Sequence, residues 1–369
     1  MAPKRKLLKK GTPDLILLLV VLGLLCIGLL MVFSSSFAAA GIQQQNPYFY
    51  LKRQGIWVLI GLVAMFVTMK MPLNTIRKLS WLGFKVTIAL LVLVFVTGEA
   101  INGSTRWLGV GSLGVSPSDL AKPVMVLCIA DLLAKNSSQI QKWKGILGTL
   151  IIAGFCCGLV LVQPDLGTTF SIAGTVFFML WAAGARKVHL GIISLAGGVA
   201  AALSILLKSY QLVRLTSFLD PFDDPTETDF QIVQSLYALG SGGLSGLGIG
   251  QSRQKFFYLP ERHTDFIFSI LGEEMGFIGC LLVILLFLLL AWRGIKIAME
   301  AEDRYMSVLA TGMTSMIILQ ACINMGVVTA LLPITGITLP FISYGGSSML
   351  FTMVEIGILL NISRYTNKR

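Results

Sequence analysis

The sequence predicts an all-α integral membrane protein of about ten transmembrane helices with one long extracytoplasmic loop. The chain is 55% apolar and only 13% charged, with a mean hydropathy of +0.81, whereas soluble domains contain about 25% charged residues. Apolar runs of roughly membrane-spanning length recur along the whole chain. Lys and Arg flank these runs instead of forming a basic domain, so the net charge of +11 reflects membrane topology and predicts no nucleic-acid partner.

The apolar runs define ten predicted spans within a single polytopic domain, residues 1–369. The first run, Leu15 to Phe33, is too long for the apolar region of a cleaved signal peptide and predicts a membrane anchor. The fourth span is the weakest because it contains Asp119, Lys122 and Asp131. The predicted spans are 14–34, 55–71, 80–97, 119–134, 145–163, 166–184, 188–206, 266–292, 306–330 and 345–362.

The distribution of basic residues predicts the orientation of these spans. If the N-terminus is cytoplasmic, 19 of the 29 Lys and Arg lie in cytoplasmic segments, 8 lie outside, and Lys85 and Lys122 lie within spans. Five of the eight outside residues fall in the long loop 207–264, and long loops carry little weight in the positive-inside rule. We therefore expect both termini in the cytoplasm and the loop 207–264 outside.

Metal-binding patterns are not evident in the sequence. The six cysteines lie inside apolar runs without metal-type spacing, so we interpret them as small lipid-facing or core residues. His263 is one of only two histidines, which excludes a histidine-rich metal site. The glycine-rich stretch Gly240 to Gly250 lacks the strand–helix context of a phosphate-binding loop, so a flexible connection is the favoured interpretation.

Three carboxylates far apart in sequence are predicted to reach the same outer face. Asp119 begins the fourth span, Asp165 lies on the turn between the fifth and sixth, and Asp265 begins the eighth. Ionisable residues are rare in spans and often functional. A plainer interpretation exists for each: an Asp119–Lys122 ion pair at the i,i+3 spacing, and helix N-caps at Asp165 and Asp265. At Asp265 the alternative is a general base or a metal ligand.

Other polar residues are harder to interpret. Arg106, before Trp107, is a candidate for contacting an anionic headgroup, and the alternative is an interfacial aromatic anchor. Glu273 and Glu274 lie on the order of 12 Å deeper than Asp265 and receive no catalytic role. Glu355, in the middle of the last span, is expected to face the interior of the bundle.

Four sequence motifs resemble those of the SEDS family (shape, elongation, division and sporulation), which includes FtsW, RodA and SpoVE. The resemblance runs from the first span to Arg364, and the motifs occur in the family's order. It is closest to the FtsW and SpoVE branch, because a glycine run ending in Gln251-Ser252 precedes Lys255. The motifs are Asn102-Gly103 with Arg106-Trp107, Gln163 to Thr168, Tyr258 to Gly276, and Leu339 to Ser348.

The resemblance implies a peptidoglycan glycosyltransferase of the bacterial plasma membrane. Such an enzyme polymerises lipid II into β-1,4 glycan strands at the outer face, for division or sporulation septum synthesis. The partners it implies are a class B penicillin-binding protein, lipid II, the nascent glycan strand and membrane lipids. A lipid II flippase and a RodA-type elongation polymerase are the alternative functions.

The family's motifs also imply roles for particular residues. The essential aspartate corresponds to Asp265, the expected catalytic base. The acidic residue and lysine of the fourth span correspond to Asp119 and Lys122, and the second aspartate to Asp165; the family commonly has Glu where this chain has the shorter Asp119. Further candidates for substrate binding are Arg106, Arg214 and His263. A divalent cation, Mg²⁺ or Mn²⁺, held by Asp265 and Asp165 is an expected aid to departure of the pyrophosphate.

Overall fold

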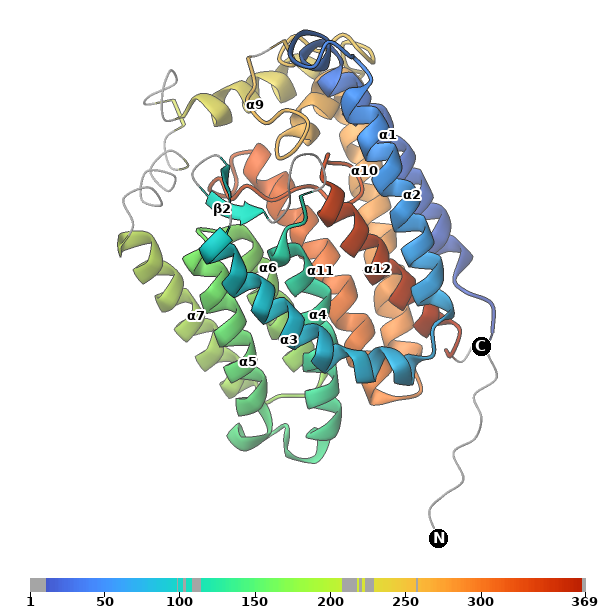
Figure 1. Cartoon of the computed structure of the whole chain (residues 1–369), viewed down its shortest axis with the longest axis vertical. Helices are drawn as coiled ribbons and strands as arrows, with labels where there is room; N and C mark the ends of the chain where they lie inside the picture. The colour runs from blue at the N-terminus through green and yellow to red at the C-terminus, as the bar shows by residue number, and fades with distance from the viewer. Residues whose placement is uncertain are drawn as a thin grey trace.

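The computed structural model describes residues 11–97, 99–101, 104–107, 114–207, 218, 221–222, 229–256 and 258–366, with side chains described outside 95–107, 205 and 207. Long helices form a bundle (Figure 1). The helices are α1 (Leu15–Gln43), α2 (Phe49–Lys70), α3 (Leu73–Thr97), α4 (Pro117–Lys135), α5 (Trp143–Val162), α6 (Leu166–Ala182), α7 (Lys187–Leu207), α9 (Phe230–Gly242), α10 (Ile267–Glu300), α11 (Arg304–Val328) and α12 (Gly346–Ser363).

The predicted fold class is confirmed, and each predicted span coincides with a helix. Within the described residues, seven helices are long and apolar enough to cross a membrane, and α6 is a shorter apolar helix. The weak fourth span is helix α4, which contains Pro123 as well as its charged residues. Pro123 lies in the second turn, where its ring nitrogen cannot donate to the carbonyl of Asp119, and the helix nevertheless continues to Lys135.

Three elements between the spans were not predicted, one of them a short 3₁₀ helix, η2 (Ser137–Gln139). Residues 99–107 contain a short antiparallel hairpin, with strands β1 (Glu99–Ile101) and β2 (Ser104–Trp107). Helix α9 lies within the segment predicted as a long loop, and Figure 1 shows it at the end of the bundle opposite to the beginning of α1 and the end of α12. Elements this short have weak sequence signals.

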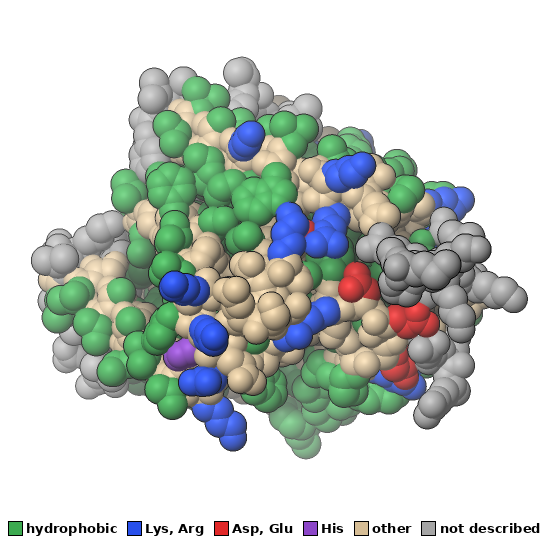
Figure 2. Space-filling view, turned by 90° about the horizontal axis from the view of Figure 1, so that it is seen from below, with side chains coloured by type: hydrophobic (Ala, Val, Ile, Leu, Met, Phe, Trp, Pro, Cys, Tyr) green, Lys and Arg blue, Asp and Glu red, His purple; other side chains and the backbone are tan. Residues whose placement is uncertain are grey.

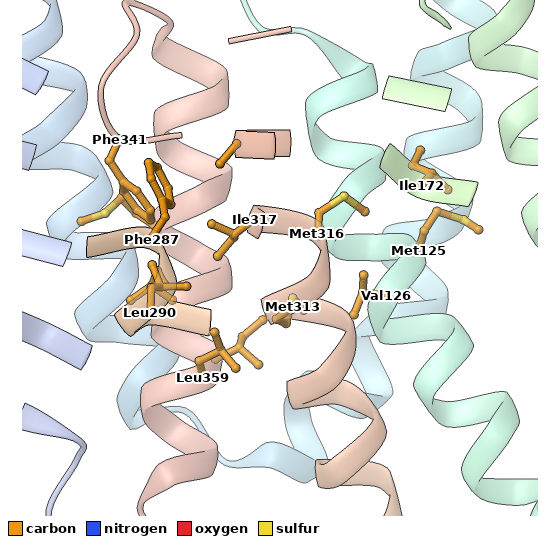
Figure 3. Packing of buried hydrophobic residues seen from close by; sticks show 14 of the residues in the cluster. Met125, Val126, Ile172, Phe287, Leu290, Met313, Met316, Ile317, Phe341 and Leu359 are labelled. Atoms are coloured by element: carbon orange, nitrogen blue, oxygen red, sulfur yellow. The ribbon is translucent and has the colours of Figure 1, made fainter. Parts of the chain in front are cut away.

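Helices α11 and α12 lie in the interior of the bundle. Below the polar ends of the helices, side chains from α4, α6, α10, α11 and α12 form an apolar layer (Figure 3). Close helix approach depends on glycine: a Cβ at Gly312 of α11 would collide with Val126 of α4, and one at Gly294 would collide with Thr314. Such small residues matter in membranes, where packing rather than water exclusion drives helix association.

Helix α10 is interrupted at Gly276, whose φ of +65° lies in the left-handed region. The glycine-rich stretch that follows α9 completes the broken backbone. The amide of Phe277 donates to Gly243 O (2.9 Å), and the freed Glu273 O accepts from the amide of Leu247 (3.0 Å). The favoured interpretation of this stretch as a flexible connection missed this contact: Gly246 packs so closely against the break that a Cβ would collide with Glu274 O.

The side chains of Glu273 and Glu274 anchor residues 252–255, which follow this stretch. Glu273 accepts from the Ser252 hydroxyl and from the amide of Arg253 (2.8 Å). Glu274 pairs with Lys255 (3.0 Å) and accepts from the hydroxyl of Ser34 in α1. These carboxylates therefore have structural partners within the chain.

We expect Lys255→Met to destabilise the protein. The side chains of Lys255 and Glu274 are 5% and 0% exposed, so removal of the lysine leaves a buried carboxylate uncompensated at a cost of about 3–5 kcal/mol. Thermal unfolding in detergent measures the effect. Lys296→Met, which removes the exposed partner of a 3.8 Å pair with Glu300, is the matched control. Equal stability of both variants would contradict the anchoring role.

Candidate functional site

The Asp119–Lys122 pair lies at the start of α4. Pro117 occupies the first turn, where its missing amide hydrogen costs little, and Asp119 follows within the same turn. Lys122 lies on the same helix face and its Nζ is 2.9 Å from Asp119 Oδ1, so the predicted pairing is confirmed. The two side chains are only 7% and 14% exposed. The pair therefore lies within the bundle and not on its surface.

Helices α11 and α12 supply further partners to this pair. The Lys122 ammonium donates to Gln320 Oε1 of α11 (3.1 Å), and the Ser347 hydroxyl at the start of α12 donates to Asp119 Oδ2 (2.7 Å). Glu355, buried in α12 as predicted, lies within electrostatic range of Lys122 and Asp119. The structure thus places the Asp119–Lys122 pair near Glu355, a neighbourhood that the sequence did not reveal.

Asp165 is the N-cap of α6, in agreement with the plainer interpretation of this residue. Its Oδ1 accepts from the amide of Thr168 (2.9 Å), and its Oδ2 accepts from the hydroxyl of Ser118 in α4 (3.4 Å). Asp165 is buried. Its carboxylate joins the starts of α4 and α6, which brings it to the same end of the bundle as Asp119.

Asp265 lies in the turn that leads into α10 and is half-buried. Its main-chain oxygen accepts from Asn324 Nδ2 of α11 (2.7 Å). A Cβ at Gly336 would lie 3.5 Å from Asp265 Oδ2, so the carboxylate faces the backbone of the segment between α11 and α12. The partial exposure leaves Asp265 accessible from this end of the bundle.

The segment between α11 and α12 holds the Asp265 turn in place. The Ser343 hydroxyl donates to Thr264 O (2.5 Å), and the amide of Tyr344 donates to His263 O (2.8 Å). Phe341, in the same segment, has a φ of +66°, a conformation that is costly for a bulky residue. Strained residues of this kind are often concentrated at functional sites.

His263 is packed between aromatic rings. Its ring centroid is 4.6 Å from that of Tyr50 and 5.6 Å from that of Tyr344. Burial lowers the pKa of His263 to about 4, so the imidazole is neutral at physiological pH. The neutral ring can still form hydrogen bonds through its nitrogens, but it carries no positive charge.

The structure thus brings Asp119, Lys122, Asp165 and Asp265 to one end of the bundle, where α4, α6 and α12 begin and α11 ends. Arg214 and the side chain of Arg106 lie outside the described residues. In the described part of the chain, no three His, Cys, Asp or Glu side chains gather as metal ligands. Both Asp165 oxygens already accept from protein donors. A cation held by Asp165 and Asp265 stays a prediction.

The sequence interpretation missed several residues of the site. Gln320 and Asn324 lie one helical turn apart on α11, and both contact candidate site residues. A signal was present, because two amides at the i,i+4 spacing in an apolar span indicate a polar helix face. Ser347 and Ser118 carried no comparable signal, since single hydroxyls are common near helix starts.

The chain resembles known proteins over nearly its full length. The family model described as "Cell cycle protein", covering FtsW, RodA and SpoVE, matches residues 15–368. Stage V sporulation protein E of Bacillus subtilis (strain 168) is 47% identical over 364 residues, covering 97% of this chain and 99% of the relative. A probable peptidoglycan glycosyltransferase FtsW of Geobacter sp. (strain M18) is 40% identical over 356 residues, covering 95% of this chain and 96% of the relative.

Solved structures show the same fold. A chain from a structure described as "Structural coordination of polymerization and crosslinking by a peptidoglycan synthase complex" has a TM-score of 0.78 at 30% identity and covers 97% of this chain and 99% of that chain. The rod shape determining protein RodA of Thermus thermophilus has a TM-score of 0.72 at 28% identity, covering 97% and 98%. The chain therefore belongs to the FtsW/RodA/SpoVE family of cell cycle proteins.

Proposed function

We propose that the chain is a peptidoglycan glycosyltransferase that polymerises lipid II into β-1,4 glycan strands. The observation that carries the proposal is the gathering of Asp265 and the Asp119–Lys122 pair at one end of the bundle, both held by α11. Membership of the family supports the same activity, since an FtsW relative bears the name of a probable peptidoglycan glycosyltransferase.

Asp265 is the proposed general base. Asp265 is half-buried at the end of the bundle that would face the sugar of a membrane-anchored substrate. It removes the proton from the 4-hydroxyl of one substrate while that oxygen attacks C1 of the other. The C1–oxygen bond to undecaprenyl pyrophosphate breaks, and the configuration at C1 inverts. Inversion requires a single base and no covalent intermediate.

Lys122 is the proposed electrostatic partner of the leaving pyrophosphate. Two of its three Nζ hydrogens have described acceptors, Asp119 and Gln320. Asp119 in turn is held by Ser347, which fixes the pair between α4 and α12. A cation fixed in advance in a site with little water stabilises developing negative charge more strongly than a mobile one.

A flippase is the less favoured alternative. Transporter sites normally lie near the middle of the membrane on broken helices. Helix α10 is broken at Gly276, but the carboxylates beside the break, Glu273 and Glu274, bind Arg253 and Lys255 of the same chain. The candidate site residues lie at the helix ends instead, which supports bond chemistry at a membrane surface.

Septum synthesis is the proposed cellular role, in division or sporulation. Two relatives of high identity are a stage V sporulation protein and a probable FtsW. We also propose a class B penicillin-binding protein as the partner. A solved structural neighbour belongs to a peptidoglycan synthase complex in which polymerization and crosslinking are coordinated, and such a complex requires a transpeptidase beside the polymerase.

Both termini are proposed to be cytoplasmic, with the site at the outer face. Figure 2 shows the end of the bundle where α1 begins and α12 ends, and Lys and Arg side chains are distributed across it. Exposed examples are Lys78, Lys135, Lys142 and Lys187. Segments on this side of the spans contain 19 Lys and Arg, against 8 on the other side. The positive-inside rule therefore supports a cytoplasmic position for this end of the bundle.

We expect a cysteine introduced at Ser241 to react from outside the cell. Ser241 is exposed at the end of α9, at the site end of the bundle. In a background without native cysteines, an impermeant thiol reagent should label Ser241→Cys on intact cells stripped of their outer layers. Lys142→Cys is the matched control and should be labelled only after lysis. The reverse pattern would overturn the orientation.

Polymerisation by the purified protein with its transpeptidase is the direct test of function. Labelled lipid II should be converted into long glycan strands, separated by length on a gel. Translocation of lipid II in vesicles without any polymer would instead support the flippase.

A further inference from the structure

Two amide side chains on α11 connect the parts of the candidate site. Gln320 Oε1 accepts from Lys122 (3.1 Å), while Gln320 Nε2 donates to Thr338 O (3.0 Å). Asn324 Nδ2 donates to Asp265 O and to Ile337 O, each at 2.7 Å. Both side chains are thus bound to the site on one side and to the segment between α11 and α12 on the other.

The chemistry of these contacts fixes the orientation of both amides. Asn324 faces two carbonyl oxygens, which only its NH₂ group can satisfy, and Gln320 faces an ammonium and a carbonyl. Gln320 is 3% exposed and Asn324 is 1% exposed. Polar side chains are costly at such positions within a span. They are therefore rare there unless they have a structural or functional role.

The two amides bind neighbouring residues of the segment between α11 and α12. Gln320 and Asn324 lie one turn apart, about 6 Å along the helix, and bind the consecutive carbonyls of Thr338 and Ile337. The Ile337 side chain lies against Gly167, where a Cβ would collide with it. The 337–338 backbone is therefore packed between α11 and the start of α6. Asp265 and Lys122 are both held relative to this backbone, through Asn324 and Gln320.

We propose that Asn324 and Gln320 are positioning residues that set the separation between the base Asp265 and the cation Lys122. Asn324 fixes the backbone of Asp265 and Gln320 fixes the ammonium of Lys122, both relative to the 337–338 backbone. This inference rests on the proposed glycosyl transfer, in which the base and the leaving-group cation act at opposite ends of one reacting bond system. A misplacement of about 1 Å can cost 10²-fold in rate.

The test uses volume-conserving variants of the full chain with its transpeptidase partner. Asn324→Leu and Gln320→Met remove the hydrogen bonds and keep the packing volume. Thr314→Val is the matched control, since it also replaces a buried polar group of α11 by an apolar one, and its hydroxyl has no described partner. Initial rates of polymerisation are measured against lipid II concentration, and thermal unfolding is measured on the same samples.

We expect Asn324→Leu to lower kcat by about 10²-fold. The KM should change by less than about threefold, because neither amide is placed against the substrate. Gln320→Met should also lower kcat and leave KM nearly unchanged. The loss in kcat should be smaller because Asp119 still holds Lys122. Thr314→Val should polymerise at the wild-type rate.

Three outcomes would overturn the inference: a wild-type kcat in Asn324→Leu, a loss confined to KM, or an equal loss in Thr314→Val. If Asn324→Leu does not fold, Gln320→Met decides the question by the same criteria. Failure of the wild-type protein to polymerise would instead contradict the proposed function, so the two failures are distinguishable.

Discussion

Asp265→Asn is expected to lower the rate of lipid II polymerisation by at least about 10²–10⁴-fold, the usual contribution of a general base. The amide keeps the shape of the carboxylate but does not accept a proton at neutral pH. The fold should remain intact, because Asn324 binds the main-chain oxygen of Asp265 and not its side chain. The turn is also held through Thr264 O, which accepts from Ser343.

The experiment needs purified protein with its transpeptidase partner, and both polymer and thermal stability must be measured on the same preparation. Asp303→Asn is the matched control, since Asp303 is also a carboxylate that precedes a long helix but lies at the opposite end of α11. This control should polymerise normally. If Asp265→Asn polymerises at close to the wild-type rate, the base lies elsewhere, and Asp165 or Asp119 would be examined next. A loss of polymer that accompanies unfolding would indicate that Asp265 serves only as part of the turn.

The helices and the local pairings could be predicted because their signals are local. A helix is present at every apolar run that was predicted to span the membrane, but the predicted ends differ from the observed ones by as many as nine residues. The i,i+3 spacing of Asp119 and Lys122 predicted that they can pair, and the position of Asp165 before a helix made a cap one of its two interpretations. Each of these features depends on residues within one turn of each other, where backbone geometry decides what can touch.

The remaining features depend on contacts between distant segments. The ladder of α10 breaks at Gly276 and is completed by amides of the glycine-rich stretch some 30 residues earlier. A sequence read alone does not show that these glycines allow close backbone contact, because the same composition is typical of flexible loops. Glu274 similarly appeared unpaired until the fold placed Lys255 and Ser34 beside it.

The site itself was predicted only in part. The loop-charge pattern placed three carboxylates at one face, but it could not identify what connects them. That connection is made by α11, whose two amides contact the turn of Asp265 and the ammonium of Lys122. Tertiary contacts of this kind become visible only when the helices are packed.

The Asp119–Lys122 pair gives the second large expected effect, and its two interpretations can be separated. Lys122→Met alone leaves the carboxylate of Asp119 without its cation in a site where it is 14% exposed. Breaking a buried pair in this way costs about 3–5 kcal/mol of stability. A loss of activity in this single variant would therefore not distinguish chemistry from folding.

The double variant Asp119→Asn/Lys122→Met removes both charges at once. In the wild-type protein, the Ser347 hydroxyl donates to Asp119 Oδ2. The amide oxygen of the new asparagine can accept the same hydrogen bond. Stability should thus return towards the wild-type value, as is common when a buried pair is replaced as a unit. Polymerisation should nevertheless stay at least about 10²-fold below wild type, because the pyrophosphate loses its fixed cation. A stable double variant that polymerises at the wild-type rate would show that the pair only joins α4 to α12. A stable and inactive one would show that Lys122 acts on the substrate.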